Sequence, residues 1–446
     1  MRTADDLRAA LADVLPGARA DLEALVRVPS VSVDPARAGA VQEAADAVAA
    51  HARDAGAASV EVVRADGGAP AVLASWPAPE GAPTVLLYAH LDVQPTGPEQ
   101  EWTSPPFAPT ERDGRLYGRG AADDKAGVLM HLAVLRAFGG TPPCGVVLFV
   151  EGEEEVGSPT LPALLAAHRD RLRADVIVIA DSANAAVDVP AFTTSLRGLV
   201  DLLVEVHLLA RPVHSGLFGG PVGDALTALC RLLATLHDDE GAVAVAGLHR
   251  GTSDAPDLDA DVFRGDVGLV DGGQLLGRGT LPERMWHQPA VTVIGLDAPA
   301  TADASNVLLP RARAKVSLRL APGDDAARAR AALTAHLQEH APWGAEVTVS
   351  GGSSGEPFAL EPSGATYDLA RQAFADAYGN DAVEAGIGGS IPFIAEFARA
   401  YPGATVLVTG VGDPASRWHG VDESLHLGMW ERACLAEALL LERLSG

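Results

Sequence analysis

Basic residues are scarce in this chain of 446 residues, and their scarcity bears on its partners. Lysine and arginine together number 33 against 59 aspartates and glutamates, which gives a formal net charge of −26. Nucleic acid and anionic membranes are not attracted to a surface of that sign. We therefore expect neither a nucleic acid nor a membrane as partner.

Cysteines and long apolar runs are also scarce. The three cysteines, Cys144, Cys230 and Cys434, lie far apart and lack the spacing of a metal site. No stretch approaches the about 18 apolar residues of a membrane span. The N-terminal segment carries acids and lacks the apolar core of a secretory signal. These features predict a soluble, cytoplasmic protein with reduced cysteines.

The most informative stretch that is present runs from Thr84 to Pro95, TVLLYAHLDVQP. Its apolar run, residues 85–88, predicts a buried strand of a parallel sheet. His90 and Asp92 follow, and side chains two residues apart in an extended segment project to the same side. Ligands bind at the carboxyl ends of strands in open α/β sheets. Two interpretations remain open here: Asp92 orients His90 as a metal ligand, or the two form a plain strand-end hydrogen bond.

Further acids and a histidine follow other predicted strands or turns. Asp123 and Asp124 precede a helical pattern, Glu153–Glu155 follow the strand GVVLFV, Asp181 ends the strand ADVIVIAD, and His419 lies in a loop after ATVLVTG. Each has an ordinary alternative, because acids also cap helices and occupy solvated turns. Their repetition at strand ends argues for a site.

The alternation of strands and helices predicts an α/β fold with a mostly parallel central sheet flanked by helices. The pattern changes near Thr194 to alternating strands and a glycine-rich loop, and a glycine-serine joint follows at 351–355. We predict a discontinuous catalytic domain, residues 1–193 and 354–446, with an inserted α+β domain at 194–353. Within the insert, residues 238–288 are interpreted as insertions and hairpins.

The motifs AHLDVQP, LYGRGAADDKAG, EGEEEVGS, IADS and WHGVDE occur in this order over nearly the whole chain. Together they resemble the dinuclear metallopeptidase family of cytosolic non-specific dipeptidases, carnosinases, aminoacylases, carboxypeptidase G and succinyl-diaminopimelate desuccinylase. The stretches VHSGLFGG (213–220) and GGSIP (388–392) are most similar to the dipeptidase branch.

This resemblance implies two divalent metal ions, with zinc expected and manganese or cobalt as alternatives. Asp123 would bridge both ions. One ion would also take His90 and Asp181, and the other Glu155 and His419. The resemblance further implies a cis peptide bond between Asp123 and Asp124.

The resemblance also assigns catalytic and substrate-binding roles. Glu154 would be the general base, Asp92 would orient His90, and His214 would stabilise the oxyanion. Glu153 is then surplus, and we interpret it as an exposed acid. The residues expected to contact the substrate are Asn306, Arg319, Gly389 and Ser390.

The implied activity is metal-dependent hydrolysis of the amide bond of dipeptides or small peptides by a homodimer, with His214 reaching into the partner subunit's site. Two alternatives stay open: an N-acyl amino acid deacylase, and a non-catalytic metal-binding homologue, which would have no need of Glu154. One departure concerns specificity. Members of the dipeptidase branch commonly carry an arginine and a glutamate just before GGSIP, where this chain has Gly386 and Ile387.

Overall fold

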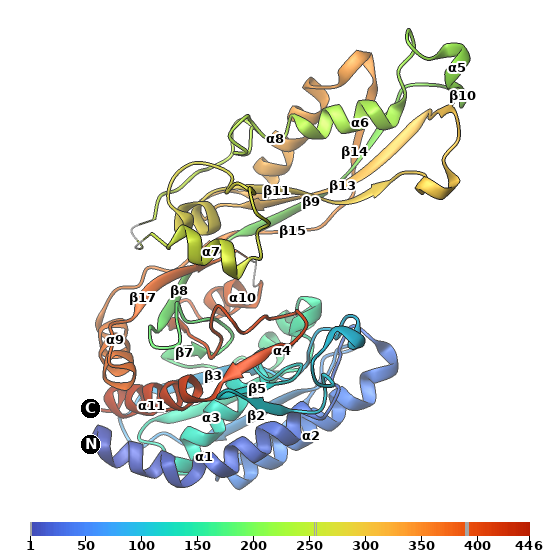
Figure 1. The fold of residues 1–446 in the computed structure, drawn as a ribbon. Helices are drawn as coiled ribbons and strands as arrows, with labels where there is room; N and C mark the ends of the chain where they lie inside the picture. The colour runs from blue at the N-terminus through green and yellow to red at the C-terminus, as the bar shows by residue number, and fades with distance from the viewer. Residues whose placement is uncertain (1, 254, 256, 389–391) are drawn as a thin grey trace. The chain divides into compact units, whose positions relative to one another are not determined.

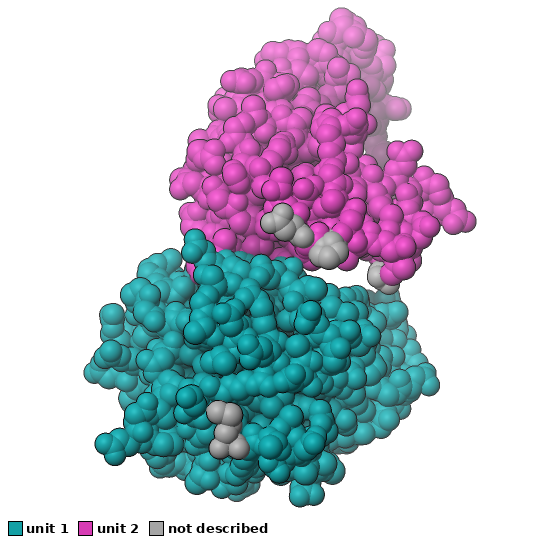
Figure 2. Space-filling view, turned by 90° about the vertical axis from the view of Figure 1, so that its left-hand side faces the viewer, with its two compact units in different colours: residues 1–194, 360–385, 391–446 teal, residues 195–359, 386–390 magenta. Residues whose placement is uncertain are grey.

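The computed structural model describes residues 2–253, 255, 257–388 and 392–446. The chain divides into two compact units, coloured separately in Figure 2. The first comprises residues 1–194, 360–385 and 391–446, and the second comprises residues 195–359 and 386–390. Each unit has its own cluster of buried apolar side chains.

A six-stranded sheet in the order β1-β2-β6-β3-β7-β18 forms the centre of the first unit (Figure 1). Its strands are β1 (Ser59–Val63), β2 (Ala71–Trp76), β3 (Thr84–His90), β6 (Gly145–Glu151), β7 (Val176–Ile179) and β18 (Thr405–Val408). The four strands β6, β3, β7 and β18 are parallel, whereas β1 and β2 pair antiparallel at one side. The carboxyl ends of β3, β6 and β7 therefore meet at one edge.

Helices cover both faces of this sheet, because its central strands carry apolar side chains on both faces. Val85 and Leu87 of β3 belong to the same buried cluster as residues of α1, α2, α3, α9 and α11. Tyr88 points to the other face and stacks on Phe393 of α10, with ring centroids 4.4 Å apart. The helices are α1 (Ala4–Val26), α2 (Ala38–Asp54), α3 (Lys125–Ala137), α4 (Leu161–Ala167), α9 (Ala365–Tyr378), α10 (Pro392–Ala400) and α11 (Leu427–Leu444).

Two smaller sheets have the orders β19-β5-β4 and β16-β8-β17. The first belongs to the first unit, whereas the second includes residues assigned to both units. Their strands are β4 (Thr110–Arg112), β5 (Arg115–Tyr117), β19 (Ser424–His426), β8 (Ala191–Leu196), β16 (Phe358–Ala359) and β17 (Val383–Ile387).

The second unit is built on an antiparallel sheet in the order β11-β13-β9-β14. Helices α6 and α8 pack on one face, because the alternate apolar residues of β9 and β13 are buried against them. The strands are β9 (Gly198–His207), β11 (Ala290–Asp297), β13 (Arg311–Leu320), β14 (Glu346–Ser350) and β15 (Ser354–Gly355), which also pairs with β9; the helices are α6 (Ala225–Ala234) and α8 (Ala326–Glu339). A short ladder joins β10 (Val213–His214) to β12 (Val307–Leu308), and α5 (Ser215–Phe218) follows β10.

The predicted α/β class with a mostly parallel central sheet is confirmed. The interpretation of residues 238–288 was incomplete, because this region contains the helix α7 (Ala260–Asp266) and a π-helical turn, Glu283–His287. Asp259 caps α7 by accepting from two backbone N–H groups, a start signal that the sequence carries. Within the described residues, none of the helices combines the length and the apolar character needed to cross a membrane.

Candidate metal centre

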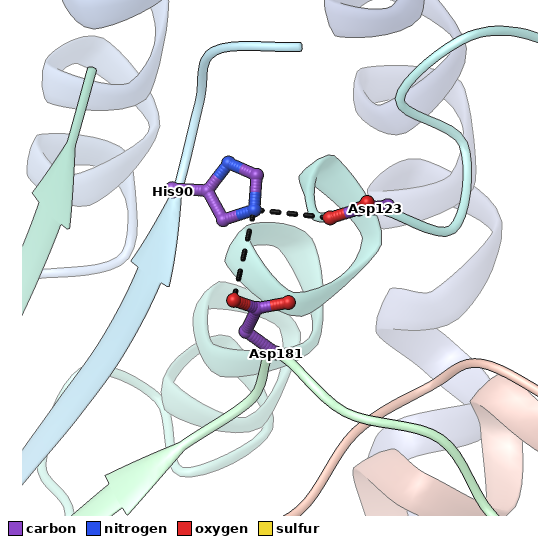
Figure 3. A group of neighbouring side chains, drawn as sticks. All are labelled: His90, Asp123 and Asp181. Atoms are coloured by element: carbon purple, nitrogen blue, oxygen red, sulfur yellow. Dashed lines mark hydrogen bonds and ion pairs between the residues drawn. The ribbon is translucent and has the colours of Figure 1, made fainter. Parts of the chain in front are cut away.

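Neighbouring parallel strands bring His90 and Asp181 together. His90 is the last residue of β3, and Asp181 follows β7 by two residues. The imidazole Nε2 of His90 lies 3.9 Å from the Asp181 carboxylate and 3.0 Å from Asp123 Oδ1 (Figure 3). One ligand atom from each of these three residues lies within 4.8 Å of the others, so they form a group able to hold a cation.

Asp123 belongs to two such groups. Its Oδ1 faces His90, while its Oδ2 lies 3.0 Å from Nε2 of His419. The peptide bond from Asp123 to Asp124 is cis, as the resemblance implied. The helix-cap alternative does not apply, since Asp124 at the start of α3 makes no side-chain cap bond and instead accepts the backbone N–H of His90.

Glu155 and His419 complete the second group with Asp123. His419 Nε2 lies 3.2 Å from Glu155 Oε2. Gln94, from the motif AHLDVQP, donates its side-chain N–H to the same Glu155 oxygen at 2.9 Å and its backbone N–H to the other at 3.2 Å. Gln94 therefore fixes the Glu155 carboxylate, a role that the sequence analysis did not assign.

The hydrogen bonds of His90 test whether the first group suits a metal. Nδ1 lies 3.0 Å from the backbone carbonyl of Asp92 and donates to it, so the neutral ring carries a lone pair on Nε2. That lone pair faces a carboxylate oxygen of Asp123 at 3.0 Å. Two electron pairs so close require a cation or a proton between them. The donor set of imidazole nitrogen and carboxylate oxygen fits zinc, manganese or cobalt.

The charges of the cluster lead to the same conclusion. Hydrogen bonds to Asp123 and Glu155 raise the pKa of His419 to about 10. Burial raises the pKa of Asp181 to about 7. Burial is the main reason why the pKa of Glu154 lies well above its usual range, and the negative charge of Asp181 raises it further. The carboxylates thus exceed the nearby positive charge, and bound divalent cations would compensate them.

Asp92 and Glu154 lie beside these groups. The buried Asp92 carboxylate is 3.5 Å from Nδ1 of His90 and accepts the backbone N–H groups of Glu154 and Glu155 at 3.2 and 3.1 Å. It therefore contacts the imidazole and the acidic turn together. The carboxylate of Glu154 forms no hydrogen bond within the described residues, and its Oε2 lies 4.0 Å from His90 Nε2.

The interpretation of Glu153 as an exposed acid is wrong. The residue is only 6% exposed, and its carboxylate accepts the backbone N–H groups of Ala69 and Thr160 at 3.0 and 2.8 Å. It also accepts the hydroxyl of Thr160. Glu153 thus ties the acidic turn to two neighbouring segments.

Glu423 is a second residue whose role the sequence analysis missed, although it ends the motif WHGVDE. Its buried carboxylate accepts the backbone N–H groups of Gly120, Ala122 and Asp123 at 3.0, 3.0 and 3.1 Å, and the Arg119 guanidinium at 2.6 Å. Both carboxylate oxygens hold the loop that presents Asp123. One segment therefore supplies His419 and also fixes the loop of Asp123.

The remaining site residues predicted from the resemblance belong to the second unit. His214 is exposed at the end of β10, where its Nδ1 accepts the N–H of Gly216 at 3.0 Å. The carbonyl of Asn306 accepts the N–H of Ser215 at 3.0 Å, so His214 and Asn306 lie on neighbouring segments. Arg319 lies on β13. Gly389 and Ser390 fall outside the described residues.

Comparison with known proteins agrees with this arrangement. Residues 86–443 match the profile of Peptidase family M20/M25/M40. The chain belongs to this family. It is 39% identical over 368 residues to a cysteinylglycine-S-conjugate dipeptidase of Corynebacterium striatum, covering 81% of each chain. It is 26% identical over 435 residues to the Cys-Gly metallodipeptidase dug1 of Schizosaccharomyces pombe, covering 91% of each.

Solved structures of the M20 family share the fold. Human carnosine dipeptidase 1 superposes with a TM-score of 0.83 at 24% identity, covering 100% of this chain and 99% of that one. The dipeptidase Dug1p of Saccharomyces cerevisiae also gives 0.83, at 22% identity, covering 99% and 98%. The resemblance to the dipeptidase branch is confirmed, and this M20 chain is a hydrolytic enzyme with a group of residues able to bind metal.

Proposed function

We propose that this M20 enzyme hydrolyses the peptide bond of dipeptides with two divalent cations, zinc being the expected metal. The observation that carries the proposal is the orientation of Asp123, whose two carboxylate oxygens each lie 3.0 Å from a different imidazole. One cation would be held by His90, Asp123 and Asp181. The other would be held by Asp123, Glu155 and His419. The printed names of the relatives, dipeptidases of cysteinylglycine conjugates and of Cys-Gly, support a dipeptide substrate.

When bound, the cations supply Lewis acidity that polarises the scissile carbonyl and lowers the pKa of the attacking water. Glu154 takes the proton of that water and later gives a proton to the leaving amine. Its carboxylate suits this role because it forms no hydrogen bond among the described residues and its pKa is raised by burial. Asp92 keeps Glu154 in place through the backbone and keeps His90 in the tautomer that presents Nε2.

The discontinuous first unit would be the catalytic domain, and the second the lid and dimerisation domain. A homodimer is supported by β11, the edge strand of the second sheet, whose Val293, Ile294 and Leu296 are exposed. Because no strand of the described residues pairs with the outer edge of β11, this apolar edge could pair with a second copy. Leu217 and Phe218, 76% and 51% exposed beside His214, support a partner there also. The free cysteines support a reducing compartment such as the cytoplasm.

A hydrolysis panel tests the proposal. Dipeptides with a free amino group, and the matching N-acyl amino acids, are supplied to enzyme reconstituted separately with zinc, manganese or cobalt. We expect cleavage of dipeptides, and loss of cleavage in the Glu154→Gln variant. Cleavage of only the N-acyl amino acids would favour the deacylase, to which the 31% identity over 183 residues with a succinyl-diaminopimelate desuccinylase of Acidovorax ebreus also points. Metal binding without any hydrolysis would favour the non-catalytic homologue.

A further inference from the structure

One fully buried histidine has no role in the proposed chemistry. His131 is the only polar residue between Ala126 and Leu135 of α3, and its side chain is 0% exposed. Its Nδ1 lies 2.7 Å from Oε2 of Glu437 on α11, and its Nε2 lies 3.1 Å from the backbone carbonyl of Tyr88 on β3. His131 therefore connects the C-terminal helix to the central sheet.

The carbonyl that His131 contacts also joins the two strands of the first cation-binding group. Ala180, which follows β7, donates its backbone N–H to the same oxygen of Tyr88 at 3.0 Å. Tyr88 is also the last residue of β3 that pairs with β7. His90 lies two residues after Tyr88, and Asp181 directly follows Ala180. This carbonyl, which accepts two hydrogen bonds, thus lies where the two strands deliver two of the proposed ligands.

The partners of the imidazole determine where its protons lie. A carbonyl oxygen only accepts, so Nε2 of His131 carries a hydrogen and donates to Tyr88. A proton also lies between Nδ1 and the Glu437 carboxylate, because two lone pairs only 2.7 Å apart would repel each other. Glu437 therefore sets the orientation of the ring and the nitrogen that it presents to the strand.

Stability alone does not account for this buried pair. Taking an imidazole and a carboxylate out of water costs free energy, and apolar residues of similar size often stabilise a core equally well or better. Oε1 of Glu437 is moreover buried without a hydrogen-bond partner among the described residues. A ring that donates to a carbonyl has an effect that an apolar side chain lacks, because it restrains the end of the strand.

We propose that His131 is a positioning residue for the cation of the first group, which consists of His90, Asp123 and Asp181. Its hydrogen bond to the Tyr88 carbonyl fixes the ends of β3 and β7, and hence the separation of the ligands that follow these strands. The inference rests on the proposed function, which supplies the cation. The second group has no ligand on either strand, so its cation should not depend on His131.

Two variants of His131 separate its two hydrogen bonds. The amide of glutamine reaches the position of imidazole Nε2, so His131→Gln keeps a donor for Tyr88 and loses the bond to Glu437. The amide of asparagine reaches the position of Nδ1, so His131→Asn keeps the bond to Glu437 and loses the one to Tyr88. Both variants should unfold at a lower temperature, because each leaves a buried group unpaired. Only His131→Asn should weaken binding of the cation in the first group.

Enzymes that keep a single group identify the affected cation. Glu155→Ala removes a ligand of the second group, and Asp181→Ala removes a ligand of the first. Competition with a chelator measures the affinity for zinc. Adding His131→Asn should lower this affinity about 10- to 100-fold in the Glu155→Ala enzyme and leave it unchanged in the Asp181→Ala enzyme. The inference is overturned by equal affinities with and without His131→Asn, by equal losses in both enzymes, or by an equal loss with His131→Gln.

Amide hydrogen exchange of the metal-free enzyme tests the positioning without any cation. The N–H of Ala180 shares the Tyr88 carbonyl with His131, so a loosened strand end should expose it more often. We expect the peptide containing Ala180 to exchange faster in His131→Asn than in His131→Gln or the wild type. Equal exchange in all three would refute the inference. If the wild type binds no zinc, the proposed function fails, and hydrogen exchange alone decides about His131.

Discussion

Glu154 and Glu155 are neighbours in the sequence with different surroundings. Glu155 is fixed by Gln94 and faces His419, whereas the Glu154 carboxylate is free of hydrogen bonds within the described residues. A carboxylate held by hydrogen bonds, like that of Glu155, suits cation binding. A carboxylate without them and with a raised pKa, like that of Glu154, suits proton transfer. Replacing Glu154 should therefore impair proton transfer, whereas replacing Glu155 should impair cation binding.

The first prediction uses this difference. Glu154→Gln keeps the shape of the side chain but accepts no proton, so kcat should fall by about 10²–10⁴-fold with the metal content unchanged. Glu155→Ala should lower both the metal content and the activity. Mass spectrometry of the metals and steady-state kinetics check both. A Glu154→Gln enzyme with near-normal kcat would disprove the assignment of the general base.

The second prediction concerns Glu423. Among the described residues, it contacts the cation-binding groups only by accepting the backbone N–H of Asp123. Glu423→Gln replaces one acceptor oxygen by an N–H₂ that faces backbone N–H groups. We expect a loss of about 10- to 100-fold in metal affinity, as for other residues that orient ligands. Competition with a chelator measures it. Glu431→Gln, an exposed acid on α11, is the control and should change nothing; equal affinities in both variants would contradict the prediction.

At the scale of single residues, the sequence predicted which residues lie at the metal centre better than it predicted the burial and hydrogen bonds of each side chain. His90 and Asp181 follow apolar strands, so their meeting at one edge follows from parallel pairing. His419 lies in a loop far along the chain, and only the family motif connected it with Asp123. Glu153 was misjudged because its burial depends on Ala69 and Thr160, whose approach no local pattern reveals. The role of Glu423 depends likewise on a loop folded against it.

At the scale of elements, β17 shows how the chain departs from the dipeptidase pattern. The chain has Gly386 where the branch has a charged residue, and a Cβ there would lie 2.4 Å from the Cβ of Trp286 and 2.7 Å from the hydroxyl of Ser195. Trp286 belongs to the π-helical turn that the sequence analysis interpreted as part of an insertion. The absence of a side chain at Gly386 is therefore matched to the position of Trp286.

The third prediction tests that match. Gly386→Ala should destabilise the protein by about 1–3 kcal/mol, the usual cost of overpacking. Combining it with Trp286→Gly should cost less than the sum of the two single changes, because glycine at position 286 removes the Cβ that lies 2.4 Å away. Thermal unfolding midpoints measure this. Gly403→Ala, where a Cβ meets no atom within 4 Å, is the control. If the effects of the changes at positions 386 and 286 are additive, the contact between these residues does not cause the destabilisation.

At the scale of the whole molecule, the proposed dimer decides how many complete sites a preparation has. The cation-binding groups belong to the first unit, whereas His214 belongs to the second. The resemblance implies that His214 serves the partner subunit's site, and the exposed apolar edge of β11 supports pairing of two copies. A two-fold dimer would then hold two sites, each made from both chains.

The last prediction follows from sites that combine residues of both subunits. Glu154→Gln and His214→Ala should each be inactive alone. In a mixed dimer one site carries both lesions and the other carries neither, so co-expression in equal amounts should restore about a quarter of the wild-type activity. The control mixes wild type with a chain that carries both changes. If His214 acts in the partner, both sites of that mixed dimer are damaged, and only about a quarter of the activity remains; if it acts in its own chain, about half remains. Activity at the level of the separate variants in the first mixture, with half retained in the second, would assign His214 to its own subunit.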